Sequence, residues 1–130
     1  KPALMASDIM EDHVEVIKES MSLLEASTFL EEIGHTGAPV VSGKGELTGF
    51  MTLRDIMKGR KNDQMQSSVT GYMQKNVITG TRDITIRDVE ELLFEHNIGH
   101  LPIVQGRAII GMITRTDYLR LVGKSGQDSE

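Results

Sequence analysis

The sequence lacks cysteine and tryptophan, and it has only three phenylalanines and two tyrosines among 130 residues. Without cysteine there is no disulfide, no thiolate metal site and no cysteine nucleophile. So few aromatic side chains argue against a platform on which single-stranded bases stack. The absence of cysteine also fits a reducing compartment, so we expect a cytoplasmic protein.

Basic residues are in deficit as well, with 14 Lys and Arg against 19 Asp and Glu, and the formal net charge is −5. A broad nucleic-acid surface normally needs a basic excess, so this charge disfavours direct nucleic-acid binding. A small anion needs only a few local donors and is not disfavoured. The basic run at residues 58–61 is interpreted as solvated, and an RNA contact there as the weaker alternative.

Long apolar runs are missing too. No run approaches the roughly 18 residues that a membrane-spanning helix needs, and residues 1–4 do not resemble a signal peptide. We therefore expect no membrane association. The sequence does not begin with methionine, and we interpret it as a segment of a longer protein.

One strand-to-helix junction is present twice. Its copies are residues 49–55 (GFMTLRD) and residues 111–117 (GMITRTD). Each has apolar residues, then a threonine, then an aspartate three positions later. A helix start carries unpaired N–H groups and the positive end of the helix dipole, which suits a phosphate. An aspartate in the first turn can accept hydrogen bonds from sugar hydroxyls, so the pattern predicts two related nucleotide half-sites.

The junctions belong to an internal repeat. A shift of 63 positions aligns Ser22 with Thr85 and Pro39 with Pro102, and after a shorter turn a shift of 62 aligns Gly49 with Gly111. Each half predicts the same order of elements, β-α-β-β-α. The capping signatures Ser22-x-x-Glu25 and Thr85-x-x-Asp88 begin the first helix of each half.

The expected elements of the first half are an extended piece over 13–17, a helix over 22–33, strands over 40–41 and 47–51, and a helix over 52–57. Those of the second half are an extended piece over 76–80, a helix over 85–96, strands over 103–104 and 108–113, and a helix over 114–122. Glycines at 34 and 37, and at 99, are expected to end the first helix of each half.

These elements predict an α+β fold of two repeats that pack with pseudo-two-fold symmetry. A half of about 60 residues rarely buries enough apolar surface alone, so the two sheets should pack together. Thr52 and Thr114 would then face a shared cleft. We expect the first repeat over 1–60, a linker over 61–68, the second repeat over 69–123 and a disordered tail over 124–130.

The chain resembles a tandem CBS-domain pair, also called a Bateman module. The resemblance rests on 8–10 (DIM) and 71–73 (GYM), on 38–40 (APV) and 101–103 (LPI), and on the paired Gly-x-x-Thr-x-x-Asp ends. Residues 33–41 and 95–102 also look like the CBS pair of bacterial tRNA nucleotidyltransferase/poly(A) polymerase-type proteins, which stands beside a DHH phosphoesterase-like domain.

The resemblance implies a regulatory module for an adenine nucleotide (AMP, ADP or ATP), with S-adenosylmethionine less favoured. In the family, the aspartate holds the ribose, the threonine contacts phosphate or ribose, and apolar residues enclose the adenine. Carried over, one site comprises Thr114, Asp117, Val77, Ile78, Thr79 and Leu101. The other comprises Thr52, Asp55, Val14, Glu15, Val16 and Ala38. His100 stands where the family often places a basic residue near the phosphates.

The two implied sites are unequal. Glu15 and Val16 stand where the other half has Ile78 and Thr79, and an acidic side chain is unfavourable beside an apolar base pocket. Gly37 stands where the second half has His100. We therefore expect the Asp117 site to hold adenosine, with the Asp55 site weaker or empty.

Simpler interpretations stay open. Thr-x-x-Asp is also an ordinary N-cap that stabilises a helix without a ligand, and His100 can be an ordinary surface histidine. His13, His35 and His96 do not show metal-ligand spacing. No nucleophile–base pair or Walker loop is present, so we expect no catalysis by this chain. The alternative function is a ligand-free dimerisation module of a larger protein, with Met21 and Met57 on its surface. The resemblance otherwise implies catalytic domains in the same chain and a homodimer.

Overall fold

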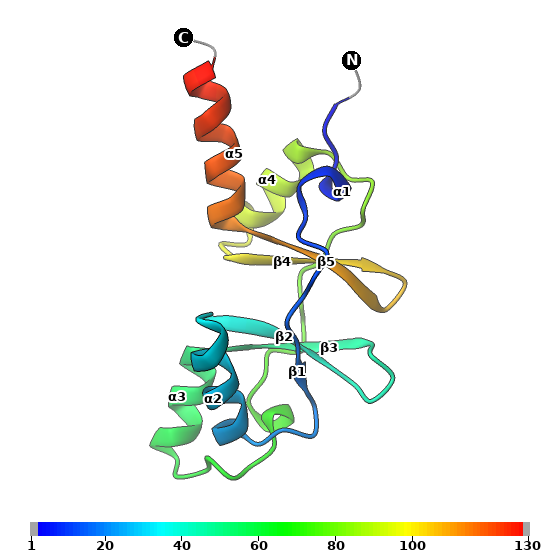
Figure 1. Cartoon of the computed structure of the whole chain (residues 1–130). Helices are drawn as coiled ribbons and strands as arrows, with labels where there is room; N and C mark the ends of the chain where they lie inside the picture. The colour runs from blue at the N-terminus through cyan, green and yellow to red at the C-terminus, as the bar shows by residue number, and fades with distance from the viewer. Residues whose placement is uncertain (1–2, 129–130) are drawn as a thin grey trace. The chain divides into compact units, whose positions relative to one another are not determined.

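The computed structural model describes residues 3–128 of the chain, and the side chains of residues 3–123. The chain divides into two compact units (Figure 1). Residues 15–77 form one of them, here called the central unit. Residues 1–14 together with 78–130 form the other, the terminal unit. Both contain helices and strands, so the α+β class with two repeats is confirmed, although the terminal unit adds a short helix over Ala6–Ile9 and has no full strand in its predicted first extended piece.

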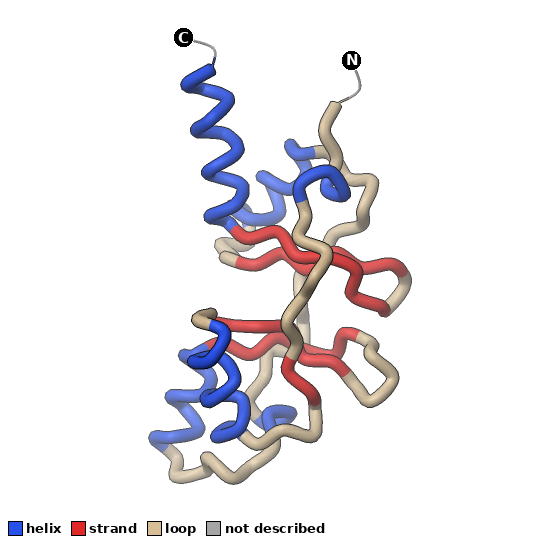
Figure 2. Tube along the Cα trace, viewed as in Figure 1, coloured by secondary structure: helices blue, strands red, loops and turns tan. Residues whose placement is uncertain are grey.

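The central unit is a three-stranded sheet with two helices. It contains β1 (Ile17–Lys18), α2 (Leu23–Ile33), β2 (Gly37–Val41), β3 (Leu47–Thr52), α3 (Leu53–Lys61) and the 3₁₀ turn η1 (Val69–Gly71). β1 pairs with β2 in parallel, and β2 pairs with β3 antiparallel. Figure 2 shows these strands in red and the helices in blue. The helices α2 and α3 lie side by side over one face of this sheet (Figure 1). Ile17, Leu30 and Met51 are fully buried between these layers.

The terminal unit repeats this plan. It contains α1 (Ala6–Ile9), α4 (Ile86–Glu95), β4 (His100–Gln105), β5 (Ala108–Thr114) and α5 (Arg115–Asp128). β4 and β5 pair antiparallel, and Gly80 adds a single parallel bridge to Ile103. This bridge occupies the place that β1 has in the central unit. Leu93, Leu101 and Ile113 are fully buried in the core of the unit.

The predicted helix starts are confirmed. Ser22 Oγ accepts from the Glu25 N–H at 3.1 Å, and the Glu25 carboxylate accepts from the Ser22 N–H at 3.1 Å. Thr85 and Asp88 form the same capping box at 3.2 and 3.0 Å. Each box satisfies two N–H groups that a helix start would otherwise leave unpaired.

The predicted helix ends are half right. Gly34 ends α2 in the left-handed conformation, with φ of 69°. The expectation that Gly99 ends the matching helix is wrong, because Asn97 takes the left-handed conformation there, with φ of 50°. Asparagine tolerates this region better than most residues, so the sequence needs no glycine at that turn.

The opening segments of the two repeats are exchanged between the units. The Met73 side chain lies on Gly49, and the Gln74 and Phe50 backbones exchange hydrogen bonds of 2.9 and 2.8 Å. In the terminal unit the Met10 side chain lies on Gly111 in the same way, and Glu11 and Met112 exchange two bonds of 2.9 Å. The opening segment of the second sequence repeat therefore completes the sheet of the first, and that of the first completes the second.

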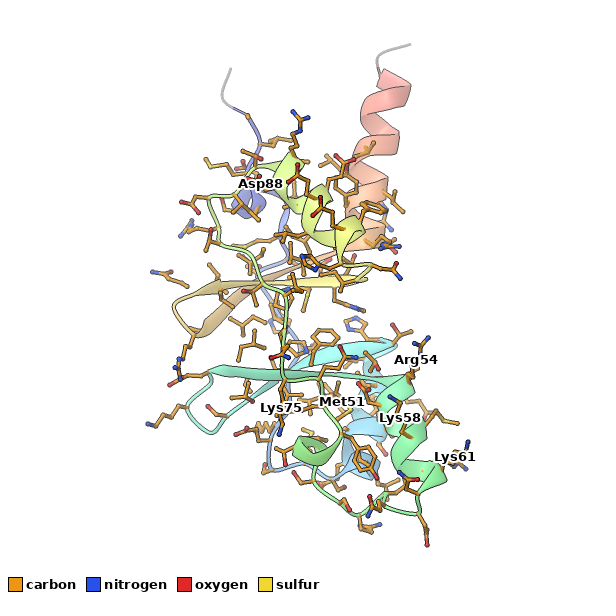
Figure 3. All side chains as sticks on the ribbon, turned by 180° about the vertical axis from the view of Figure 1, so that it is seen from behind. Met51, Arg54, Lys58, Lys61, Lys75 and Asp88 are labelled. Atoms are coloured by element: carbon orange, nitrogen blue, oxygen red, sulfur yellow. The ribbon has the colours of Figure 1, made fainter. Side chains whose placement is uncertain are left out.

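The predicted linker is largely ordered by packing. α3 continues to Lys61 rather than ending near Met57, because Gly59 is a site of close contact with Leu23 and not a helix breaker. Lys58 and Lys61 therefore project from a helix (Figure 3), in a last turn where the helix dipole favours cations. After α3, the Ser67 and Met65 carbonyls accept from the first N–H groups of α2 at 2.9 Å.

The C-terminal helix is also longer than predicted. α5 is assigned over Arg115–Asp128, whereas the sequence predicts a helix to residue 122, and the disordered tail over 124–130 stays a prediction. Residues 129 and 130 of that predicted tail lie outside the described residues. The repeat boundaries 1–60 and 69–123, and the shared cleft, stay predictions.

Replacing Gly49 by alanine should destabilise the protein by about 1–3 kcal/mol, the usual cost of overpacking. A Cβ there would lie 2.5 Å from Met73 Sδ and 3.0 Å from the Gln74 carbonyl oxygen, and the carbonyl cannot move without breaking the sheet edge. Urea unfolding measures the loss. The control is Gly43→Ala, because a Cβ at Gly43 meets nothing within 4 Å and should change stability by less than about 0.5 kcal/mol.

Candidate functional site

In the central unit, the strand-to-helix junction is a tight capping box. The Asp55 Oδ2 atom accepts from the Thr52 N–H at 3.0 Å and from the Thr52 hydroxyl at 2.9 Å. The Thr52 hydroxyl oxygen accepts in turn from the Asp55 N–H at 3.3 Å. Asp55 is only 4% exposed. The hydroxyl proton of Thr52 is therefore already in use within the cap.

The matching junction of the terminal unit is looser. The Asp117 Oδ2 atom lies 3.4 Å from the Thr114 nitrogen, and the Thr114 hydroxyl oxygen accepts from the Asp117 N–H at 3.1 Å. The Asp117 side chain is 25% exposed, and its Oδ1 atom lies 3.8 Å from a nitrogen of Arg120. The Thr114 hydroxyl donates to no described residue, so its proton can be given to a ligand oxygen.

Both aspartates thus use one carboxylate oxygen for the cap and keep the other for a further donor. Among the described residues, nothing donates a hydrogen bond to Oδ1 of Asp55 or of Asp117. A carboxylate oxygen accepts readily from a hydroxyl group. The capping interpretation and the ligand interpretation are therefore compatible at the same residue.

The helix starts themselves offer less to an anion than the sequence suggests. The first N–H of α3, from Leu53, donates to the Thr36 carbonyl at 2.9 Å, and that of α5, from Arg115, donates to the Gly99 carbonyl at 2.9 Å. The third N–H of each helix is held by the threonine. This leaves the second N–H of each helix, on Arg54 and Thr116, and a phosphate would need side-chain donors as well.

The residues expected around the adenine fall mostly within the unit that carries their aspartate. Ala38 and Leu101 are buried at the second position of β2 and β4. The first residue of β2, Gly37, pairs with Thr52 across the antiparallel ladder, and the first residue of β4, His100, pairs with Thr114. His100 is half-buried and has an interaction partner, and its role near a phosphate stays a prediction.

The two extended stretches of the predicted sites are where the chain passes from one unit to the other. Glu15 and Val16 belong to the central unit with Thr52, and Ile78 and Thr79 belong to the terminal unit with Thr114. Val14, which is predicted for the Asp55 site, belongs to the terminal unit, and Val77, which is predicted for the Asp117 site, belongs to the central unit. Ile78 packs partly buried against the core of the terminal unit.

Sequence reasoning overlooked two arginines beside the Asp117 junction. Arg120 is the ion-pair partner of Asp117, although an exposed pair of this kind contributes little. Arg115 lies over the Phe94 ring, 4.6 Å from its centroid. Phe94 in turn meets Tyr118 edge to face at 5.8 Å. Burial, and then a hydrogen bond with Glu90, raise the pKa of the Tyr118 hydroxyl, so this ring stays neutral at physiological pH.

The part of the chain that the structure describes contains no candidate metal cluster and no candidate membrane span. No three His, Asp or Glu side chains there gather closely enough to hold a metal ion. No described helix has both the length and the apolar character needed to cross a membrane.

Asp55→Ala should lower thermal stability more than Asp117→Ala. The first change removes a buried carboxylate that accepts two hydrogen bonds and leaves the Thr52 hydroxyl without its acceptor, for an expected cost of about 2 kcal/mol, the upper end for caps. The second removes a more exposed carboxylate that accepts a single hydrogen bond of 3.4 Å, for an expected cost below about 1 kcal/mol. Thermal unfolding of both variants, with Glu91→Ala as an exposed control, measures the difference. Equal losses would contradict this ranking of the two caps.

The chain matches the family model described as the CBS domain twice, over residues 6–62 and 69–124. It is 35% identical over 119 residues to the homoserine O-acetyltransferase of Methanohalobium evestigatum, covering 89% of this chain and 24% of that protein. It is 28% identical over 119 residues to the A-adding tRNA nucleotidyltransferase of Aquifex aeolicus, covering 92% of this chain and 14% of that protein. This chain thus spans a quarter or less of these two relatives.

Among solved structures, it resembles the CBS domain pair of protein MJ0100, determined in complex with 5′-methylthioadenosine and S-adenosyl-L-methionine. The TM-score is 0.85 at 27% sequence identity, over 95% of this chain and 99% of the other. The two family matches cover nearly the whole sequence and correspond to its two repeats. The chain therefore belongs to the CBS family and is a tandem CBS-domain pair, a regulatory module rather than a catalytic domain.

Proposed function

We propose that this chain senses an adenine nucleotide, AMP, ADP or ATP, and regulates an enzyme to which it is attached. The observation that carries the proposal is the doubled Thr–Asp pair. In each copy one carboxylate oxygen closes the helix cap, and the other has no donor among the described residues. A ribose hydroxyl is the donor that fits this oxygen.

The Asp117 half-site is the stronger candidate for the nucleoside. Thr114 keeps a hydroxyl proton to donate, whereas Thr52 gives its proton to Asp55. Asp117 is also more accessible than Asp55. Thr79, His100 and Leu101 accompany it in the same unit, and a histidine side chain can donate to a phosphate oxygen.

The solved CBS pair of MJ0100 supports the adenosine part of the proposal, since both of its ligands contain adenosine. The kinship to an A-adding tRNA nucleotidyltransferase supports a nucleotide-handling enzyme as the regulated partner. We place the module in the cytoplasm, in keeping with its lack of cysteine. Direct nucleic-acid binding is not part of the proposal, because the net charge of −5 opposes it.

A ligand acts as a regulator only if it binds two arrangements of the protein with different affinity. An adenine nucleotide held at the starts of α3 or α5 would favour one arrangement and so bias the attached enzyme. The direction of the effect, activation or inhibition, depends on which arrangement the enzyme needs.

The second candidate function is dimerisation through the helices. Exposed apolar side chains favour it: Leu24, Leu53 and Met57 in the central unit, and Phe94, Leu119 and Val122 in the terminal unit. Met57 is 58% exposed, as this function requires. Met21 instead packs partly buried against the core of the central unit, so it contributes less than the sequence suggests.

Saturating AMP, ADP or ATP should raise the melting temperature of the chain. A ligand that binds only the folded state adds RT ln(1 + [L]/Kd), about 2.7 kcal/mol at a hundred times Kd. Differential scanning fluorimetry with these nucleotides, S-adenosylmethionine and 5′-methylthioadenosine measures the shift, with CMP as the control for the base. A stable dimer in sedimentation with no shift for any adenosine compound at millimolar concentration would favour the dimerisation function instead.

Asp117→Ala should weaken adenine-nucleotide binding more than Asp55→Ala does. A hydrogen bond to a charged group contributes about 1.5–3 kcal/mol, so the loss at Asp117 corresponds to tenfold or more in Kd. Isothermal titration calorimetry well below the melting temperature of each variant separates affinity from stability. The reverse order of affinities would move the nucleoside to the Asp55 half-site.

A further inference from the structure

Arg115 follows Thr114 directly, so the sequence alone places a cation beside the residue that is predicted to contact a phosphate. In the structure, however, the Arg115 side chain forms its hydrogen bonds with other protein groups. The Nη2 atom donates to the Leu93 carbonyl at 3.1 Å and to Asn97 Oδ1 at 3.3 Å. The guanidinium lies over the Phe94 ring. All three partners belong to the end of α4 and the turn after it.

The matching turn of the central unit shows what this contact replaces. There the Gly34 N–H reaches the last carbonyls of α2, those of Leu30 and Glu31. The next residue, His35, donates to the Leu30 carbonyl at 3.1 Å, as Ile98 donates to the Leu93 carbonyl at 3.0 Å. At the matching point of the terminal unit Asn97 takes the left-handed conformation, and the second donor to the Leu93 carbonyl is the Arg115 guanidinium rather than a backbone N–H.

The same residue also fixes the strand that carries His100. The Arg115 N–H donates to the Gly99 carbonyl at 2.9 Å, and His100 begins β4 opposite Thr114. Arg115 thus joins the end of α4, the turn over 97–99 and the first turn of α5. Its matched residue, Leu53, makes the backbone bond but has an exposed apolar side chain that cannot make the others.

Two features of the Arg115 contacts are unfavourable for the stability of the fold. The Arg115 Nε atom is buried and has no hydrogen-bond partner among the described residues, and a buried donor without an acceptor is unfavourable. An asparagine at φ of 50° is also less favourable than a glycine would be. A glycine at position 97 would end the helix without an arginine from another element, as in the central unit.

We infer that Arg115 is a positioning residue of the Asp117 half-site. It does not touch the ligand. It holds Thr114, Asp117 and His100 in the relative positions that an adenosine ligand needs, by tying α5 to the turn that leads into β4. This inference rests on the proposed nucleotide binding.

The test compares Arg115→Leu, which installs the residue of the matched repeat, with Asn97→Gly and with the double variant. Arg115→Leu should lower the melting temperature and weaken AMP and adenosine by the same factor, about tenfold. Asn97→Gly in that background should restore the melting temperature, because glycine caps α4 by itself, but should not restore either affinity. Arg87→Leu, an equal change of charge at an exposed position of α4, should leave both affinities unchanged.

Three results would overturn the inference. Affinity that returns together with the melting temperature would make Arg115 a stability residue only. A loss confined to AMP, with adenosine unaffected, would make it a phosphate ligand. Unchanged binding in Arg115→Leu would remove it from the site. If the wild-type chain binds neither compound in the same titrations, the proposed function itself fails, and the inference fails with it.

Discussion

Each sheet in this protein depends on a strand edge supplied by the other sequence repeat. The Gln74 backbone closes the edge of β3 at Phe50, and the Glu11 backbone closes the edge of β5 at Met112. The Met73 and Met10 side chains lie over Gly49 and Gly111 at these edges, where any larger residue would push them away. The glycine that opens each Gly-x-x-Thr-x-x-Asp stretch is thus required by packing, six residues before the aspartate that caps the next helix.

Local sequence signals predicted the local structure well. The Ser22 and Thr85 capping boxes lie where their spacing places them, and the apolar pattern located the two long helices and the antiparallel strand pair of each repeat, although it missed the short helix α1. The failures come from contacts between residues far apart in sequence. Gly59 looks like a helix breaker until Leu23 is seen against it. The exchange of opening segments leaves no periodic signal, because a single bridged residue such as Gln74 has no strand pattern of its own.

In the candidate site, too, the local pattern was predictable and the contacts that depend on the folded structure were not. The Thr52–Asp55 and Thr114–Asp117 pairs are evident from spacing alone, but spacing cannot tell a helix cap from a ligand site, since one carboxylate can serve both. What distinguishes the pairs is burial and the direction of one hydroxyl proton. Neither is encoded in a motif. The hydrogen bonds of Arg115 could not be predicted from the sequence either, because its partners Leu93 and Asn97 lie 22 and 18 residues upstream.

The division of the chain into units has a topological consequence. The terminal unit is made of two pieces, and the central unit is one continuous stretch of 15–77 placed between them. In terms of connectivity, the central unit is an insertion held at both ends, while both ends of the described chain leave from the terminal unit. The backbone of a domain fused at either end would therefore join the unit that carries Asp117, and the backbone continues to Asp55 only across residues 14–15 or 77–78.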